Sequence, residues 1–379
     1  MAEPTAPNLP SRTWLVLGLA LLACLLFLPR LGTRDLWDPD EPRYALVSRE
    51  MWRTDQFLVP HQNGRVYAEK PPLLFWIQGL LSSVAGGHGT WVARLPSAVA
   101  AVGSTVLTGL MGARLFGPAC GWLAGLFFAT AHLVQWNGHT GTMDSLVSFW
   151  VVLSAWLFVR RLDDPAPPFG ALLPAYLALG VSTLAKGPPG ALTLLVAVLA
   201  VRWRVSGRAA AFAVRPLLGL AAATGVCLLW LGPAYLQNGP AYLEAIVVKQ
   251  TVVRFLQPWH HYHGPFYYFG MVLLDFLPWT GLMLLGGGAA WRLGWRGRES
   301  RWLFPLAWAV VTLVFFSFSS GKRNVYLLPC FPALALLASA AVGEWRAGRL
   351  ATWVRPSLAL PHVVFAGAAL AALAGALSQ

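Results

Sequence analysis

The feature that most constrains this chain is a series of long apolar runs, which begins near residue 14 and continues to residue 377. A helix of about 20 apolar residues matches the hydrocarbon thickness of a bilayer. In lipid the backbone N–H and C=O groups must be satisfied internally, and these runs lack the alternation of membrane β-strands. The sequence therefore predicts an all-α polytopic membrane protein, with 1–379 as a single transmembrane domain.

The charged residues are few, and they are arranged as in a membrane protein. Only 11% of the 379 residues are charged, whereas soluble domains carry about 25%. The net charge of +13 comes mostly from short arginine clusters between apolar runs, such as Arg160-Arg161 and Arg202/Arg204/Arg208. The positive-inside rule produces such clusters. A nucleic-acid-binding stripe would need a polar domain to hold it, so no nucleic-acid partner is expected.

About eleven spans are predicted, and the arginine clusters orient them. The stretch 71–87 could be a span or an interfacial helix. Treated as interfacial, it leaves all the arginine clusters on the side of the N-terminus, which is then cytoplasmic. The main outer loops become 32–93, with interfacial helices and the expected catalytic residues, and 237–265. The predicted spans are 13–31, 94–113, 118–137, 145–160, 169–185, 188–201, 216–236, 266–289, 302–319, 325–342 and 357–377.

Carboxylates are concentrated in the first outer loop. Seven of the 15 acidic residues lie between positions 35 and 69, and Asp144 stands alone at the outer start of a span. An acidic group within a bilayer costs about 2.5–3.5 kcal/mol on insertion scales, so those near hydrocarbon usually have partners or tasks. We interpret Asp35, Asp38 and Asp55 as solvated loop charges. For Asp40, Glu69 and Asp144 the surrounding motifs favour a function.

The segment DPDEPRYALVSREM predicts an amphipathic helix that opens at the pair Asp40-Glu41. Pro42 suits an early helical position, and Asp40 could cap the exposed N–H groups. Capping alone would not explain Arg43 and Tyr44 one turn later on the same face. The sequence therefore leaves both a capping role and a functional role open for the acidic pair.

A second motif, NGRVYAEKPPLLFW, places Glu69 and Lys70 directly before two prolines. Pro71 and Pro72 favour an extended backbone before them, which fixes where the Glu–Lys pair points. A neighbouring Glu and Lys often occur by chance on a protein surface. Before two prolines at a membrane boundary, the pattern indicates a functional site.

Several motifs together resemble a known family. DEPRY, VYAEKPPLLFW, ARLPSA, a lone MD before a span, AKGP, RF…H…PFYY, LPW and SxGKRNxYLLPxxPALALL occur in this order. The order is similar to that of the bacterial aminoarabinose transferase and protein-mannosyltransferase-like family, over about residues 13–343. The resemblance implies a GT-C-type transmembrane bundle in the bacterial inner membrane, which uses a polyprenyl-phosphate sugar at an active site facing the periplasm.

The same resemblance implies roles for individual residues. Asp40 matches the catalytic carboxylate, Glu41 completes its acidic pair, and Asp144 matches the second loop carboxylate. Lys70 matches the phosphate-binding lysine, and Arg43 and Tyr44 share the motif of Asp40. Longer family members carry a periplasmic domain after the last span, and we expect none here.

A divalent metal such as zinc is one expectation for the histidine-rich run WHHYHGPFYY. Glu69 occupies a position that can ligate a metal in the family, and imidazole with carboxylate suits zinc. The family has one recognisable histidine here, whereas this chain offers His260, His261 and His263, of which His261 and His263 are the expected ligands. The alternative is an interfacial loop of amphipathic aromatic residues.

Outer basic residues are candidates for binding a lipid phosphate at the headgroup level. We expect Lys322 and Arg323 to join Lys70 and Arg43 in this role. Lys186 is interpreted as an interfacial anchor that snorkels to the membrane surface.

The expected reaction transfers a sugar, with inversion, from a polyprenyl-phosphate donor to an extracytoplasmic acceptor. That acceptor is a lipid A-type glycolipid, another glycan or a protein, and no nucleotide is involved because no nucleotide-binding fingerprint occurs. The alternative is a transporter or flippase of lipids or lipid-linked sugars. Transporters place ionisable groups within spans, and here Asp275 is the only acidic residue predicted within one.

Overall fold

The computed structural model describes residues 9–253, 262–319 and 321–350. Within these ranges the regular secondary structure is helical apart from one antiparallel hairpin of two short strands and an isolated bridge, and loops and turns connect the helices. The elements are α1 (Leu9–Phe27), α2 (Asp40–Arg53), β1 (His61–Gln62), β2 (Arg65–Val66), α3 (Leu73–Ala85), α4 (Thr90–Phe116), α5 (Pro118–Thr130), α6 (His132–Gly138), α7 (Asp144–Val159), α8 (Phe169–Lys186), α9 (Pro189–Ser206), α10 (Arg208–Ala213), α11 (Pro216–Leu243), the π-helix η1 (Glu244–Val253), α13 (Tyr267–Asp275), α14 (Thr280–Ala290), the π-helix η2 (Trp291–Arg296), α15 (Ser300–Phe318), the 3-10 helix η3 (Asn324–Cys330) and α16 (Phe331–Arg346).

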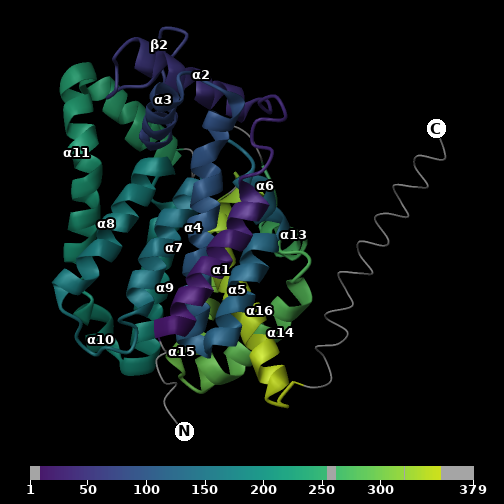
Figure 1. Ribbon diagram of the computed structural model, residues 1–379. Helices are drawn as coiled ribbons and strands as arrows, with labels where there is room; N and C mark the ends of the chain where they lie inside the picture. The colour runs from purple at the N-terminus through teal and green to yellow at the C-terminus, as the bar shows by residue number, and fades with distance from the viewer. Residues whose placement is uncertain (1–8, 254–261, 320, 351–379) are drawn as a thin grey trace.

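The long helices form an upright bundle (Figure 1). In the described part of the chain, six helices are long and apolar enough to cross a membrane, or seven if one bent pair counts as a span. Four further apolar helices are shorter: Arg12–Phe27, Leu73–Ala85, Pro118–Thr130 and Asp144–Val159. The polytopic helical architecture is thus confirmed, whereas the number of eleven spans stays a prediction. The predicted span 357–377 lies outside the described residues.

The helix of residues 324–346 is the core of the bundle, and α11 is its outer edge. In the apolar stretch of 324–346, 94% of the residues are buried, against 11% in that of 208–250. The sequence of α16, FPALALLASAAVGEWR, explains its place, because its alanines let neighbouring helices approach closely. The exposed leucines of α11, such as Leu229 and Leu236, instead suit contact with lipid.

The segment predicted as the single span 266–289 is broken in the structure. The chain bends by 118° between α13, which ends at Asp275, and the helix that begins with α14 at Thr280. Pro278 lies in this break, and the residue before a proline disfavours the helical conformation. Trp279 donates from Nε1 to Thr130 Oγ1 at 2.8 Å, which ties the break to the end of α5.

Segment 32–93, the predicted first outer loop, stands at one end of the bundle and carries α2, the β-hairpin and α3 (Figure 1). The hairpin turns at Asn63-Gly64, which both have positive φ (53° and 74°), the conformation that an Asn-Gly hairpin turn requires. The Glu50 carboxylate of α2 accepts both backbone N–H groups at 2.7 Å. The predicted helix in 71–87 is present as α3, and its interfacial position stays a prediction.

The opposite end of the bundle is organised by a buried arginine. Arg202 of α9 is only 4% exposed. Its guanidinium donates to five backbone carbonyls, at distances of 2.8–3.3 Å: those of Ala210, Arg161, Leu162, Asp164 and Pro165. The arginine thereby fastens the loop after α7 and the short helix α10 to one another.

Candidate active site

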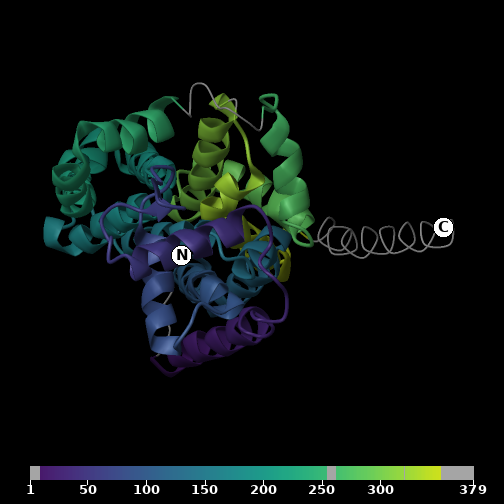
Figure 2. The ribbon, with the colours of Figure 1, turned by 90° about the horizontal axis from the view of Figure 1, so that it is seen from above.

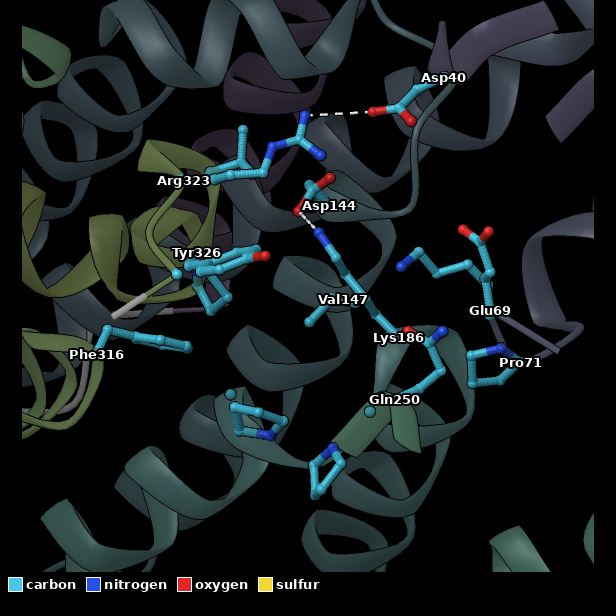
Figure 3. Close-up of a pocket in the computed structure, with 18 of the residues that line it drawn as sticks. Asp40, Glu69, Pro71, Asp144, Val147, Lys186, Gln250, Phe316, Arg323 and Tyr326 are labelled. Atoms are coloured by element: carbon cyan, nitrogen blue, oxygen red, sulfur yellow. Dashed lines mark hydrogen bonds and ion pairs between the residues drawn. The ribbon is translucent and has the colours of Figure 1, made fainter. Parts of the chain in front are cut away.

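A cavity of about 580 Å³ opens beside the first outer loop (Figure 3). Segments from the beginning, middle and end of the chain line it. In the view from above, the purple first loop lies next to both the teal and the yellow-green helices (Figure 2). The lining comes from Pro39, Asp40, Arg43 and Tyr44, Glu69 to Pro71, Asp144 and Val147, Lys186 to Gly190, Ile246 and Gln250, Phe316, Ser319, Gly321, Arg323, Val325, Tyr326 and Pro329.

Asp40, the first residue of α2, links two arginines in this cavity. Its Oδ1 accepts from Arg43 Nη2 at 2.6 Å, and its Oδ2 accepts from Arg323 Nη2 at 3.2 Å. The second contact, drawn in Figure 3, joins positions 283 residues apart. The side chain makes no capping hydrogen bond, and Pro39 is the N-cap residue. The capping interpretation of Asp40 is therefore wrong, because both oxygens face guanidinium groups instead.

The electrostatics of Asp40 favour its ionised form. Burial raises the pKa of this carboxyl, but the charges of Arg323 and Arg43 outweigh that effect and hold the pKa below its ordinary value. Asp40 is consequently a carboxylate at neutral pH and a weak base. It is better suited to holding two guanidinium groups than to removing a proton.

Asp144, the first residue of α7, forms an ion pair with Lys186 at the end of α8 (Figure 3). The Lys186 ammonium also lies 5.2 Å from the ring centroid of Tyr326, within range of a cation–π interaction. Lys186 thus lines the cavity, which the interpretation as an interfacial anchor did not anticipate. Its signal in the sequence is AKGP, where the lysine ends a helix directly before the glycine and prolines that start α9.

Glu69 and Lys70 line the same cavity, beside Pro71. Glu69 Oε2 lies 3.5 Å from Arg43 Nη1, so that Arg43 contacts the carboxylates of both Asp40 and Glu69. Tyr44 lies beneath Arg43, whose guanidinium carbon is 5.8 Å from the tyrosine ring centroid. Burial raises the pKa of the Tyr44 phenol well above its ordinary value, so the phenol stays protonated.

Two of the predicted catalytic and phosphate-binding residues do not line the cavity. Glu41 is 2% exposed and pairs with Arg94. Lys322 is also 2% exposed, and its ammonium donates to the backbone carbonyls of Ser319 and His263. Burial lowers the pKa of Lys322. The structure thus brings Asp40, Arg43, Tyr44, Glu69, Lys70, Asp144 and Arg323 together around one cavity.

The described residues do not form the expected metal site. Over residues 9–253, 262–319 and 321–350, no group of three or more His, Cys, Asp and Glu side chains is placed to hold an ion. The Glu69 carboxylate pairs with Arg43, and the ring of His263 stacks on Tyr267 with centroids 4.2 Å apart. His260 and His261 lie outside the described residues.

Comparisons with known proteins find sugar transferases that are similar to this chain. Residues 69–253, nearly half of the chain, match the family model described as dolichyl-phosphate-mannose-protein mannosyltransferase. An undecaprenyl phosphate-alpha-4-amino-4-deoxy-L-arabinose arabinosyl transferase of Edwardsiella ictaluri is 34% identical over 329 residues, which are 84% of this chain and 58% of that protein. The chain therefore spans less than two thirds of the length of this relative.

Solved structures show the same likeness in the fold. ArnT from Cupriavidus metallidurans bound to undecaprenyl phosphate superposes with a TM-score of 0.74 at 25% identity, over 87% of this chain and 60% of that one. An oligosaccharyltransferase of Archaeoglobus fulgidus, in a complex with Zn and sulfate, gives a TM-score of 0.58 at 13% identity, over 92% of this chain and 52% of that one. The second likeness is one of fold alone.

Proposed function

We infer the function of this chain from a resemblance that the comparisons confirm: in sequence and in its GT-C fold it is similar to the aminoarabinose transferase and protein-mannosyltransferase-like family. The chain transfers a sugar, with inversion, from a polyprenyl-phosphate donor to an acceptor outside the cytoplasm. The acceptor is a glycolipid of the lipid A type, another glycan or a protein. The reaction takes place in the inner membrane, with the cavity facing the periplasm.

The observation that carries this proposal is the convergence of cations on one cavity next to the outer loop. Four basic side chains line it: Arg43, Lys70, Lys186 and Arg323. Three carboxylates line it as well, those of Asp40, Glu69 and Asp144, so cations are in excess by one. When a sugar leaves a polyprenyl phosphate, negative charge develops on the phosphate, and prearranged cations stabilise that charge.

Arg43 and Arg323 are the best placed groups for the leaving phosphate, because Asp40 holds one on each side. Guanidinium groups bind phosphate oxygens in pairs, with a geometry that fits their planar fork. In this proposal Asp40 orients the two arginines. Its weak basicity suits this role, because the carboxylate keeps the negative charge that attracts both guanidinium groups.

Asp144 is the candidate base when the acceptor is a hydroxyl, because its carboxylate makes a single ion pair, with Lys186, whereas both oxygens of Asp40 are taken by guanidinium groups. The acceptor oxygen attacks the anomeric carbon while its proton passes to the Asp144 carboxylate. The bond from that carbon to the phosphate oxygen breaks, and the electron pair leaves with the phosphate. An acceptor that is itself a phosphate needs no base, and Asp144 with Lys186 then orients the sugar.

A divalent ion on Glu69 remains a prediction that needs His260 or His261 as a further ligand. The described side chains do not complete such a site, and no step above depends on it. A metal at Glu69 would supply positive charge to the leaving phosphate.

The direct test is mass spectrometry of lipid A, other glycolipids and glycoproteins from cells with and without the protein. We expect one class of molecule to gain a single sugar mass only when the protein is present. If no class changes, while the polyprenyl-linked sugar accumulates on one side of the membrane, the chain is a transporter rather than a transferase.

A further inference from the structure

Directly behind the cavity, Glu41 and Arg94 form a buried ion pair that the proposed reaction does not use. Their side chains are 2% and 1% exposed. Arg94 Nε donates to Glu41 Oε1 and Arg94 Nη2 donates to Glu41 Oε2, both at 2.9 Å. A two-pronged contact of this kind fixes direction as well as distance. The pair joins α2 of the first outer loop to α4 of the bundle.

The remaining donors of Arg94 hold the segment that leads into α2. Nη1 donates to the carbonyls of Leu31 and Arg34, at 2.7 and 2.9 Å, and Nη2 donates to that of Asp35 at 2.6 Å. A guanidinium has five N–H donors, and with the two bonds to Glu41 all five are used. The approach to Asp40 is therefore fastened to α4 by a single side chain.

Glu41 also contacts the segment before Asp144, so that this segment is held to α4 as well. Its Oε1 also accepts the backbone N–H of Gly141 at 2.6 Å, three residues before the start of α7. Arg34 adds a parallel link, because it donates to Glu41 Oε2 and to the carbonyl of His139, both at 3.0 Å. The Glu41 carboxylate thus holds both the segment that leads to Asp40 and the segment that leads to Asp144.

The fit around Gly141 shows how closely these segments pack. A Cβ atom on this residue would lie 2.8 Å from the carbonyl oxygen of Ala93 and 3.5 Å from Glu41 Oε1. Ser97 of α4 adds a second tie, since its hydroxyl donates to the carbonyl of Thr142 at 2.8 Å. Helix α4 is the common support for both loops.

We propose that Glu41 and Arg94 are positioning residues, which set Asp40 and Asp144 in their places at the cavity. The proposal rests on the proposed function in taking those two carboxylates as groups of the reaction. Glu41 follows Asp40 in the first turn of α2, so a fixed Glu41 side chain fixes the start of the helix that carries Asp40. A displacement of a reacting group by about 1 Å can lower the reaction rate about 100-fold. A residue pair that fixes the positions of Asp40 and Asp144 therefore affects the rate.

The test compares two lysine variants of equally buried arginines. Arg94→Lys keeps the charge but loses the planar fork. Arg202→Lys is the matched control, because Arg202 also uses five donors, at the end of the bundle away from the cavity. Both variants are expected to lower the melting temperature.

Hydrogen–deuterium exchange of the purified full chain then shows which segments each arginine holds. We expect Arg94→Lys to speed exchange at least about tenfold in both 36–44 and 139–146, because local opening becomes easier. Arg202→Lys should instead affect 160–166 and 207–212. Faster exchange in only one of the segments 36–44 and 139–146, or in neither, overturns the proposal. This result does not depend on sugar transfer.

The rate of transfer, measured with a polyprenyl-phosphate sugar at equal amounts of folded protein, separates positioning from stability. We expect kcat to fall about 10-fold to 100-fold in Arg94→Lys and to stay within about twofold in Arg202→Lys. An equal kcat in both variants would leave the pair a purely structural role. If Arg94→Lys does not fold, Gly141→Ala retains the ion pair while it pushes the second loop away from Glu41. Faster exchange in 139–146 together with a lowered kcat is then expected, and an unchanged kcat overturns the proposal. If the wild type transfers no sugar, the proposed function is wrong. The exchange measurement still decides whether Arg94 holds the two segments.

Discussion

The ammonium of Lys186, at the end of α8, lies against the carboxylate of Asp144, at the start of α7. Their side chains are 20% and 12% exposed, so this pair is shielded from water more than a surface salt bridge is. The lysine supplies positive charge to the cavity and also holds the candidate base.

Replacement of this lysine tests its contribution to transfer. In Lys186→Met we expect kcat to fall about 100-fold, because a cation near the developing charge is lost and Asp144 is left unpaired. The measurement is the transfer rate at matched protein level. Lys249→Met is the control, since Lys249 pairs with Glu244 on the surface, where both side chains are more than half exposed. Equal rates in the two variants would remove Lys186 from the site.

The orientation in the membrane is tested with reporters at the two ends of the bundle. A reporter inserted at Asn63, in the turn of the hairpin, should be extracytoplasmic. One inserted after Gly207, between α9 and α10, should be cytoplasmic, because the arginine clusters lie at that end. The opposite pair of results would place the cavity in the cytoplasm, where a periplasmic acceptor cannot reach it.

The ion pairs of Asp40 predict a particular dependence of stability on pH. Because the pKa of Asp40 in the folded protein is below its ordinary value of 3.8, the stabilisation is fully present above pH 3.8. It is lost as the pH falls through the lower, folded-state value. The difference in melting temperature between wild type and Asp40→Asn should therefore be constant from pH 5 to 8 and shrink in strong acid. A difference that changes between pH 5 and 8 would mean that another group is responsible.

Elemental analysis of the purified protein decides whether Glu69 binds a metal. If it does, the wild type retains a divalent ion that Glu69→Ala lacks. Glu50→Ala provides a control at a carboxylate that accepts two backbone N–H groups in the hairpin instead. Equal metal content in the wild type and Glu69→Ala removes the metal and leaves Glu69 as the partner of Arg43.

The fold was largely predictable, since apolar runs report directly on helices that cross lipid. The break between α13 and α14 was missed because the residues on both sides of Pro278 are apolar, so hydropathy alone does not register a change in direction. A proline inside an apolar run was the available signal. The number of spans depends on more than hydropathy, since several helices are shorter than a bilayer is thick.

The cavity was predictable in its carboxylates and less so in their partners. Asp40 and Glu41 are neighbours in the sequence, but successive helical residues point about 100° apart. One of them therefore faces the cavity, while the other faces Arg94. Lys186 was missed because snorkelling explains a lysine at a helix end equally well. Only the tertiary structure brings Lys186 and Asp144 together.

The substitution Asp40→Asn tests the central claim that the cavity around this residue is the transfer site. The asparagine keeps the size of the side chain but loses the charge that holds Arg43 and Arg323, and the absence of a capping bond means that α2 loses none. Asp55→Asn is the control, because Asp55 is exposed in the loop after α2.

Both variants would be assayed for sugar transfer from a polyprenyl-phosphate donor, at matched protein level in the same membranes. We expect Asp40→Asn to lower the rate by about 10²–10⁴-fold at unchanged expression, and Asp55→Asn to leave it unchanged. A rate near that of the wild type in Asp40→Asn would show that the reaction takes place elsewhere in the protein.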